Sequence, residues 1–154
     1  MRVTAEKAWA VLGTTTFGRW LFARIICLKA PYFATIHPRF RRLEPGICEI
    51  ELRKRRAVLN HIGTVHAIAM CNAAELAAGL VTEVTLPPSC RWIPKRMHVE
   101  YLKPARTNLV ATARCTLPIS LSECPIIDVV VETKDAAGLA VFQAVVSMYV
   151  STRR

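Results

Sequence analysis

The longest apolar stretch of the chain covers residues 60–81 and predicts a helix that starts after Gly63. Apolar side chains occupy nearly every side of this helix, so we expect it to be buried at the centre of a domain. The stretch is too short and too often interrupted for a membrane span. The polar interruptions are Thr64, His66, Asn72 and Glu75.

The flanking segments alternate polar and apolar residues, as half-buried strands do. We expect strands at residues 47–56 before the helix and at 96–102, 109–117 and 139–150 after it. Residues 126–131 form an apolar run that is typical of an interior strand. One helix followed by an antiparallel series of strands predicts an α+β fold, in which the sheet curls around the helix and covers all its faces.

The breaks between these elements are marked by turn-forming residues. Residues 43–46 and 135–138 have the composition of tight turns. A double proline at 87–88 predicts a loop after the helix. Residues 32–40 are expected to form a short edge strand, with Pro38 limiting its pairing.

Residues 3–28 predict one or two amphipathic helices, broken near residues 13–16. We therefore divide the chain into an N-terminal helical arm, residues 1–30, and a main domain, residues 31–154. The arm combines apolar surface with basic side chains. It either packs on the domain or on a partner subunit, or it makes a weak contact with a membrane surface.

The composition of the chain is that of a globular protein. Of its 154 residues, 53% are hydrophobic and 21% are charged, which argues against disorder and fits one domain. The net charge of +10 suits nucleic acid, acidic lipid or a polyanionic coenzyme. Nucleic acid is disfavoured, because the sequence has neither a recognition-helix pattern nor aromatic residues interleaved with basic ones.

Six cysteines are scattered along the chain without a CxxC pair, and their spacing fits no zinc site. Several of them lie within apolar runs. We expect reduced, buried thiols in a cytoplasmic protein that uses no metal. The six are Cys27, Cys48, Cys71, Cys90, Cys115 and Cys124.

Glu75 is the unusual residue of the predicted helix, because a buried carboxylate is costly unless it is paired or used in chemistry. A helix turns by about 100° per residue, which places Glu75 on a stripe of small and polar neighbours, with His66 on the other side. A carboxylate in such a place is suited to proton transfer near neutral pH. The stripe consists of Thr64, Ile68, Cys71, Asn72, Glu75 and Gly79.

From about residue 31 to its C-terminus, the chain resembles the hotdog-fold family of acyl-CoA thioesterases. The resemblance rests on an Asn-His-x-Gly-x-x-His-Ala motif before the helix, on the acid within it, and on residues 99–106. The phenylacetyl-CoA thioesterase branch has the same interval of fifteen residues between its asparagine and its acid, here Asn60 and Glu75 (75 − 60). Ala67 and Ile68 stand where that branch has two glycines. The GTVHA and NAAE segments resemble an uncharacterised hotdog branch more closely.

This resemblance implies a sheet wrapped around a central helix and a tight homodimer, often paired into a homotetramer, with two sites at the subunit interface. It implies hydrolysis of acyl-CoA to free acid and coenzyme A. It implies no metal and no cofactor, since coenzyme A enters only as part of the substrate.

The resemblance also assigns roles to single residues. The backbone N–H of Ala67 is the leading oxyanion donor, since a helix N-terminus offers free N–H groups. Asn60 holds the carbonyl or the attacking water, or else it only shapes the turn, where Thr64 is a further candidate. Glu75 of the second subunit acts as general base or nucleophile, unless its carboxylate only pairs with Asn72 or with an arginine of a partner helix.

Other residues carry weaker expectations. His66 is interpreted as a structural hydrogen-bonding group at the helix start. His61 supports an alternative, because 3-hydroxyacyl dehydratases of the same fold use a histidine and a glutamate, here Glu75, at a similar separation. Their Pro-Gly-rich turn is absent here. Because Ala67 replaces a glycine of the related branch, the alternative of a non-catalytic protein that binds acyl-CoA also stays open. The candidates for contact with the coenzyme A phosphates are Lys95, Arg96, Lys103 and Arg106.

Overall fold

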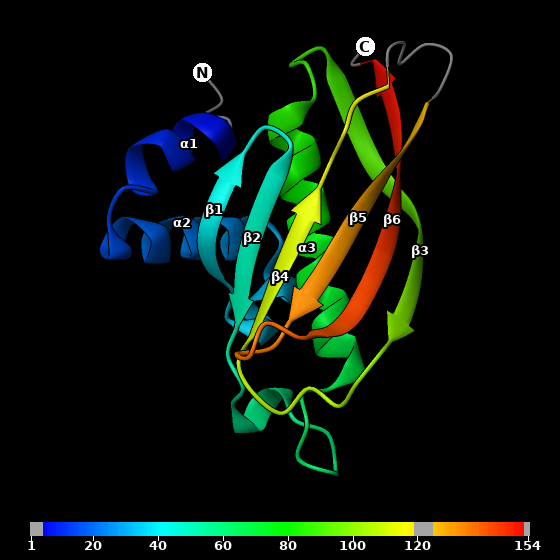
Figure 1. The fold of residues 1–154 in the computed structure, drawn as a ribbon. Coiled ribbons are helices and arrows are strands. Elements are labelled where there is room, and N and C mark those ends of the chain that lie inside the picture. The colour runs from blue at the N-terminus through cyan, green and yellow to red at the C-terminus, as the bar shows by residue number, and fades with distance from the viewer. Residues whose placement is uncertain (1–4, 119–124, 153–154) are drawn as a thin grey trace.

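The computed structural model of the chain describes residues 5–118 and 125–152. Two helices lead into a β-hairpin, one long helix and four further strands, and all strand pairs are antiparallel. The sheet has the order β1-β2-β4-β5-β6-β3 and curves around α3 (Figure 1). The α+β architecture predicted from the sequence is therefore confirmed. The elements are α1 (Ala5–Leu12), α2 (Thr16–Lys29), η1 (Pro31–Ile36), β1 (Arg39–Glu44), β2 (Ile47–Leu52), η2 (Arg56–Val58), α3 (Ala67–Thr85), β3 (Cys90–Tyr101), β4 (Leu109–Arg114), β5 (Ile126–Lys134) and β6 (Ala140–Thr152).

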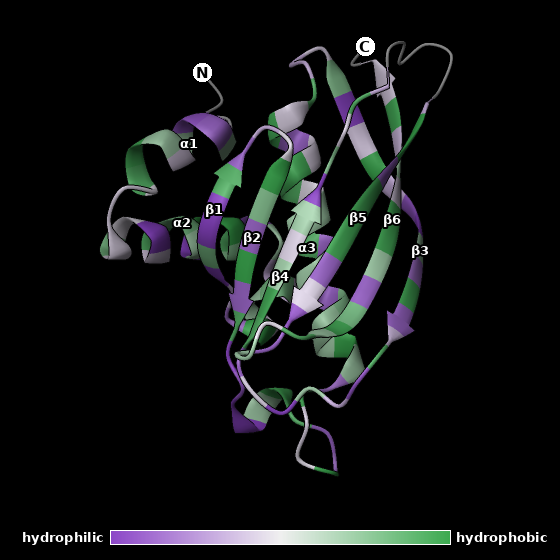
Figure 2. Cartoon of the chain, in the orientation of Figure 1, coloured by the Kyte–Doolittle hydropathy of each residue, from purple (hydrophilic) through white to green (hydrophobic). Residues whose placement is uncertain are grey.

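Small side chains bring α3 close to the sheet. Ala74, Ala77 and Ala78 are fully buried on the helix, which packs against β2, β4 and β5. On β4, Ala111 and Ala113 are fully buried as well. Figure 2 shows the strands alternating between hydrophobic and hydrophilic residues. Alternate residues point to opposite faces of a sheet, so the apolar half of each strand faces the helix.

One stripe of α3 remains uncovered. Twelve of its nineteen residues are buried, but Ile68 is 54% exposed and Glu75 is also exposed. The expectation that the sheet covers every face of this helix is therefore wrong. The helix is also long and apolar enough to cross a bilayer, contrary to the argument from its length, but 72% of the relevant window is buried within the chain.

The N-terminal arm forms two helices that are broken at residues 13–15, as predicted, while residues 3 and 4 lie outside the described part. Phe22 of α2 is fully buried. Its ring makes edge-to-face contacts with Trp9 and Phe40, at centroid distances of 5.1 and 5.0 Å. Such contacts add to the burial of apolar area. The arm therefore packs on the domain within a single chain.

Residues 32–40 do not form the expected edge strand. Pro31 instead opens the 3-10 helix η1, because a proline at the first helical position already has a helical φ. His37 then ends η1 in the left-handed region, with φ of 49°. The first strand starts only at Arg39.

Several boundaries differ from the predicted ones. The strand expected to reach residue 56 ends at Leu52, and the strand expected from residue 96 begins at Cys90. β5 lies inside the sheet, but its residues alternate in burial and Val130 is 53% exposed, so only one of its faces is covered. Both predicted hairpin turns are confirmed, with Gly46 and Gly138 at φ of 86° and 80°.

Three of the cysteines are buried thiols, as expected: Cys27, Cys48 and Cys115. Burial raises the pKa of each of these thiols, which keeps them protonated and unreactive. Cys71 and Cys90 are only half-buried, and Cys124 lies outside the described residues.

Candidate functional site

Asn60 organises the loop that leads into α3. Its Oδ1 accepts hydrogen bonds from the backbone N–H groups of Ile62 (3.1 Å) and Thr64 (3.0 Å), and its Nδ2 donates to Thr64 Oγ1 at 2.7 Å. Gly63 has φ of 75°, which favours glycine at this position. Asn60 and Thr64 therefore shape the turn, and the second Nδ2 hydrogen of Asn60 is left over for a bound group.

The N-terminus of α3 keeps one backbone donor available. His66 is the N-cap, and its Nδ1 accepts a hydrogen bond from the Ile68 N–H at 3.1 Å, which confirms the predicted structural role. The backbone carbonyl of His66 accepts hydrogen bonds from the N–H groups of Ala69 and Met70. Within the described part of the chain, the N–H of the half-buried Ala67 has no acceptor. A free N–H at the positive end of a helix is well suited to stabilise an oxyanion.

Glu75 lies two turns further along the uncovered stripe of α3. The burial expected for its carboxylate is wrong for a single chain, because Glu75 lies on the exposed side of the helix. Its side chain instead lines an open cavity of about 310 Å³ between α2, η1, α3 and β3. The other lining residues are mostly apolar: Ile26, Lys29, Ala30, Phe33, Leu76, Gly79, Leu80, Trp92 and Pro94.

Trp92 of β3 forms one wall of this cavity and is held there from two sides. Its indole N–H donates to Glu83 Oε2 at 2.8 Å. Its ring lies over Gly79, where an added Cβ would come within 2.7 Å of Trp92 Cη2. A side chain at position 79 would therefore push the indole out of place.

A polar pair lies between the helix N-terminus and Glu75. Cys71 Sγ and Tyr101 Oη are 3.3 Å apart, and either group can donate the hydrogen. This hydrogen bond is the main cause that raises the pKa of Tyr101 to about 12, with smaller contributions from burial and from the thiol charge. The Tyr101 ring contacts Phe142 of β6, at a centroid distance of 5.6 Å.

The two groups with the most useful chemistry are too far apart to act together within one chain. Eight residues separate Ala67 from Glu75, which is about 12 Å along a helix axis. A carbonyl group bound at the Ala67 N–H is therefore out of reach of Glu75 in the same chain.

The four basic residues predicted to bind phosphates separate into two pairs. Lys95 Nζ lies 5.3 Å from the centroid of the Tyr149 ring, and Arg96 donates to Ser147 Oγ at 3.5 Å. Alternate residues of β6 point into the core, so this pair lies on the sheet face opposite α3.

The other pair lies near the start of α3. Lys103 and Arg106 are exposed on the loop after β3, whose Ala105 carbonyl accepts a hydrogen bond from the Val65 N–H at 2.9 Å. This contact places the loop beside the segment that enters the helix. Of the four candidates for phosphate contact, Lys103 and Arg106 are therefore the two that lie near the start of α3.

Two further expectations concern His61 and metals. His61 is exposed in the loop before α3, and nothing in the described residues links it to Glu75. Within residues 5–118 and 125–152, no cluster of three or more His, Cys, Asp or Glu side chains is placed to hold a metal ion.

Comparisons with known proteins identify the family. The model of a domain of unknown function, DUF4442, matches residues 18–150. The chain belongs to the DUF4442 family. None of the curated proteins matches it in sequence. A structural-genomics crystal structure, target APC5556, is similar over 97% of this chain and 98% of its own, with 40% identity and a TM-score of 0.83.

More distant structures identify the fold. A probable thioesterase from Pseudomonas aeruginosa covers 86% of this chain and 95% of its own, with 21% identity and a TM-score of 0.75. A thioesterase from Staphylococcus aureus covers 79% and 98%, with 14% identity and a TM-score of 0.70. The chain therefore has the hotdog fold, and the resemblance stated from the sequence is confirmed at that level.

Several residues of the site were not found by sequence reasoning. Trp92 and Phe33 form cavity walls. Phe33 lies in the segment expected to be an edge strand, and Trp92 lies between the loop predicted at 87–88 and the strand predicted from residue 96. Tyr101 was recognised only as a strand residue and as part of the segment 99–106. The cavity also depends on how α2 approaches α3, and neither helix pattern alone reveals this packing.

Proposed function

We propose that this DUF4442 protein is a homodimeric acyl-CoA thioesterase. The observation that carries this proposal is the uncovered stripe of α3, which presents a free N–H at Ala67 and a carboxylate at Glu75 beside an apolar cavity. A helix start and an acid are the two groups that hydrolysis of a thioester needs. Because they lie about 12 Å apart along one helix, each site would take Ala67 from one copy and Glu75 from the other.

A distant relative supports the choice of residues. Two structures of the Staphylococcus aureus protein carry alanine in place of a glutamate in one and of a glutamine in the other, at positions 47 and 32 of that chain. These positions are fifteen residues apart, and the same interval separates Asn60 from Glu75 here. Asn60 is therefore proposed to hold the carbonyl or the water with its remaining Nδ2 hydrogen.

The reaction can be written with these groups. Glu75 takes a proton from water while the water oxygen forms a bond to the thioester carbon. The charge that develops on the carbonyl oxygen is stabilised by the Ala67 N–H. The carbon–sulfur bond then breaks, and the departing coenzyme A sulfur takes the proton from Glu75, which regenerates the carboxylate.

The cavity and the nearby basic loop suit the two halves of the substrate. The apolar walls around Glu75 provide space for an acyl group. Lys103 and Arg106, on the loop beside the helix start, are proposed to contact coenzyme A phosphates. Lys95 and Arg96 would take part only if a partner subunit approached the opposite sheet face.

The edge strand β3 is proposed as the dimer contact. Within the described residues it pairs only with β6, so its twelve residues leave a row of backbone donors and acceptors open. Such an edge is a natural place for another chain to pair. Antiparallel pairing of two copies would place the uncovered stripes of their α3 helices near each other.

The decisive experiment measures release of free coenzyme A from short, medium, long and aromatic acyl-CoAs. We expect turnover of at least one class by the wild type and a loss of about 10²–10⁴-fold in Glu75→Gln. Glu6→Gln is the matched control, because it removes the same charge from an exposed site on α1, away from the proposed site and dimer contact. Equal rates in both variants and the wild type would overturn the assignment of Glu75.

The same experiment separates catalysis from binding. Tight acyl-CoA binding without turnover by the wild type would replace the thioesterase with a non-catalytic binding protein. If the wild type neither binds nor hydrolyses acyl-CoA, the likeness to hotdog thioesterases would extend to the fold alone.

A further inference from the structure

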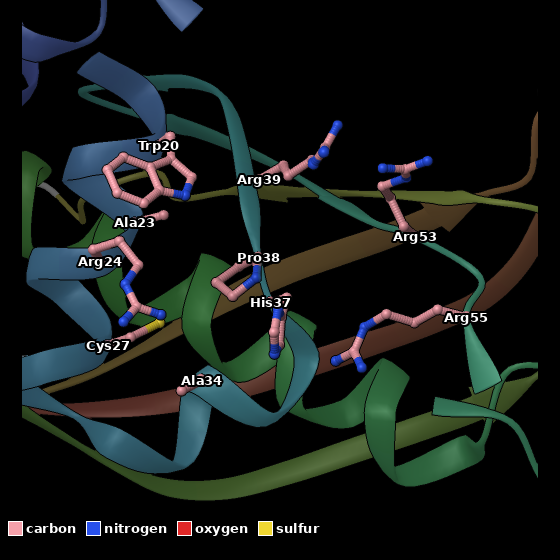
Figure 3. Close-up of a pocket in the computed structure, with 10 residues that line it drawn as sticks. All are labelled: Trp20, Ala23, Arg24, Cys27, Ala34, His37, Pro38, Arg39, Arg53 and Arg55. Atoms are coloured by element: carbon pink, nitrogen blue, oxygen red, sulfur yellow. The ribbon is translucent and has the colours of Figure 1, made fainter. Parts of the chain in front are cut away.

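A second pocket, of about 240 Å³, lies on the opposite side of α2 from the Glu75 cavity. It is enclosed by α2, the end of η1, the start of β1 and the segment that follows β2 (Figure 3). Arg24 enters it from α2, and Arg55 extends toward it from the other side, with His37 between them. None of its lining residues belongs to the proposed thioesterase site.

The pocket gathers positive charge without a matching acid. Its lining includes Arg24, Arg39, Arg53 and Arg55, and it contains no carboxylate. Within the described part of the chain, none of these four guanidinium groups forms an ion pair. Gathering like charges is unfavourable, so a cluster of this kind favours the binding of an anion.

Two acids of the β1–β2 hairpin are already engaged by other arginines. Glu51 accepts a hydrogen bond from Arg41 at 3.2 Å, and Glu44 accepts one from Arg42 at 2.7 Å. Arg41 and Arg42 therefore have their own partners outside the pocket. The four arginines of the pocket are a separate set.

Arg55 provides an independent observation. One end of its guanidinium is fixed, because Nη2 donates to the carbonyl oxygen of Thr35. Its Nε, however, is buried and has no hydrogen-bond partner. Leaving a buried donor of a charged group unsatisfied is costly, and an acceptor from a bound molecule would remove this cost.

The backbone at the pocket is also unusual. His37 is the only residue other than glycine with a positive φ in the described part of the chain, at 49°. A non-glycine residue in this region costs free energy and often occurs at functional sites. Here the conformation brings the His37 ring to the centre of the pocket, next to Pro38 (Figure 3).

We propose that this arginine pocket binds a phosphate group. Arginine side chains from three segments of the chain line this pocket, and planar guanidinium forks fit the oxygens of a tetrahedral dianion better than a single carboxylate. The exposed Trp20, at the wall of the pocket, provides a flat apolar surface for the group that carries the phosphate. The phosphate comes either from a soluble phosphate compound or from a phospholipid headgroup.

The test uses the full-length protein and two kinds of probe. The soluble probes are inorganic phosphate and pyrophosphate, titrated by calorimetry. The lipid probes are vesicles of phosphatidylcholine with and without phosphatidic acid, followed by sedimentation. We expect saturable binding of one kind of probe and a weakening of about tenfold or more in Arg55→Gln.

Two further variants guard against false conclusions. Arg53→Gln changes an exposed residue of the same pocket and serves if Arg55→Gln does not fold. Arg114→Gln removes the same charge from an exposed position on β4, outside the pocket, and is expected to change binding by less than about twofold.

The outcomes separate the two phosphate sources and the alternatives. Loss of soluble phosphate binding in the pocket variants supports a soluble ligand. Loss of binding only to vesicles that contain phosphatidic acid supports a lipid headgroup. Equal effects of Arg114→Gln, or no binding of any probe by the wild type, overturn the proposal. Glu75→Gln should bind the probes normally, so failure of the thioesterase proposal remains distinguishable.

Discussion

Both faces of α3 carry apolar residues, but the surroundings of the two faces differ. The face toward the sheet is made of residues such as Ala74 and Ala77, which are fully buried against the strands. The outer stripe also carries apolar residues, yet Ile68 is 54% exposed and Glu75 stands open beside a cavity. Hydrophobicity is therefore shared by both faces, and only the first face is covered within one chain.

This difference separates what holds the chain together from what the chain offers to other molecules. Apolar residues that stay exposed on a monomer mark an interface or a binding surface. The inner face is expected to control the stability of the fold, whereas the outer stripe is expected to control assembly and activity. Substitutions on the two faces should therefore have separable effects.

The largest effect on stability is expected on the inner face. Ala77→Leu adds three carbon atoms at a site with no exposed surface, where the helix lies close to the sheet. Such overpacking costs about 1–3 kcal/mol of the free energy of unfolding, which urea denaturation measures. Ala10→Leu on the exposed side of α1 should change it by less than about 0.5 kcal/mol. Equal stability of the two variants would contradict the close contact of helix and sheet.

Much of the fold could be predicted from the sequence, because its strongest patterns arise from burial within one chain. The apolar run correctly predicted a central helix, and the alternating segments correctly predicted strands. The two predicted turns are confirmed at Gly46 and Gly138. The region around residues 32–40 was predicted wrongly, because Pro31 starts a 3-10 helix rather than a strand. Local composition could not distinguish these two outcomes.

The candidate site could be predicted only in part, for a physical reason. The helical period placed six residues on one stripe, of which Thr64, Asn72 and Gly79 are buried in the structure. Ile68, Cys71 and Glu75 of that stripe face outward. Their exposure could not be predicted, because an apolar residue that faces the core and one that faces a partner look the same in sequence. Trp92 was missed for another reason: its role depends on its approach to Gly79 across the fold.

The arginine pocket was even harder to predict from the sequence. Its charges come from α2 (Arg24), from β1 (Arg39) and from the segment after β2 (Arg53 and Arg55). In the sequence, Arg39 and Arg55 stand in short basic runs that are typical of solvated strand ends, and Arg24 stands apart from both. The fold brings these charges together in one pocket, and no local sequence pattern predicts that pocket.

A smaller effect is expected on the outer stripe, in assembly rather than in folding. Ile68→Lys places a charge where the proposed dimer would bury an apolar side chain. We expect the dissociation constant of the dimer to rise about tenfold, equivalent to about 1.4 kcal/mol, as measured by analytical ultracentrifugation. The free energy of unfolding of the monomer should stay unchanged.

Val11→Lys is the matched control for this assembly test. It makes a similar change at a 75% exposed apolar residue of α1, away from α3. It should leave the dimer intact. If the two variants dissociate equally, or if neither does, the outer stripe of α3 is not the interface.

The smallest effect is expected at the pair Cys71 and Tyr101, where the outer stripe meets the end of β3. Because their hydrogen bond is the main cause that raises the pKa of Tyr101 to about 12, Cys71→Ala should lower this pKa toward the ordinary value of about 10. Ultraviolet absorbance of the phenolate measures this pKa, and Tyr101→Phe identifies the signal.

The raised pKa of Tyr101 means that the folded chain holds this proton more tightly than the unfolded chain. Its contribution to stability is therefore complete below pH of about 10 and is lost as the pH rises toward 12. An unchanged titration in Cys71→Ala would mean that the contact of Tyr101 with α3 does not persist in solution, and the polar part of the outer stripe would then be open along its whole length.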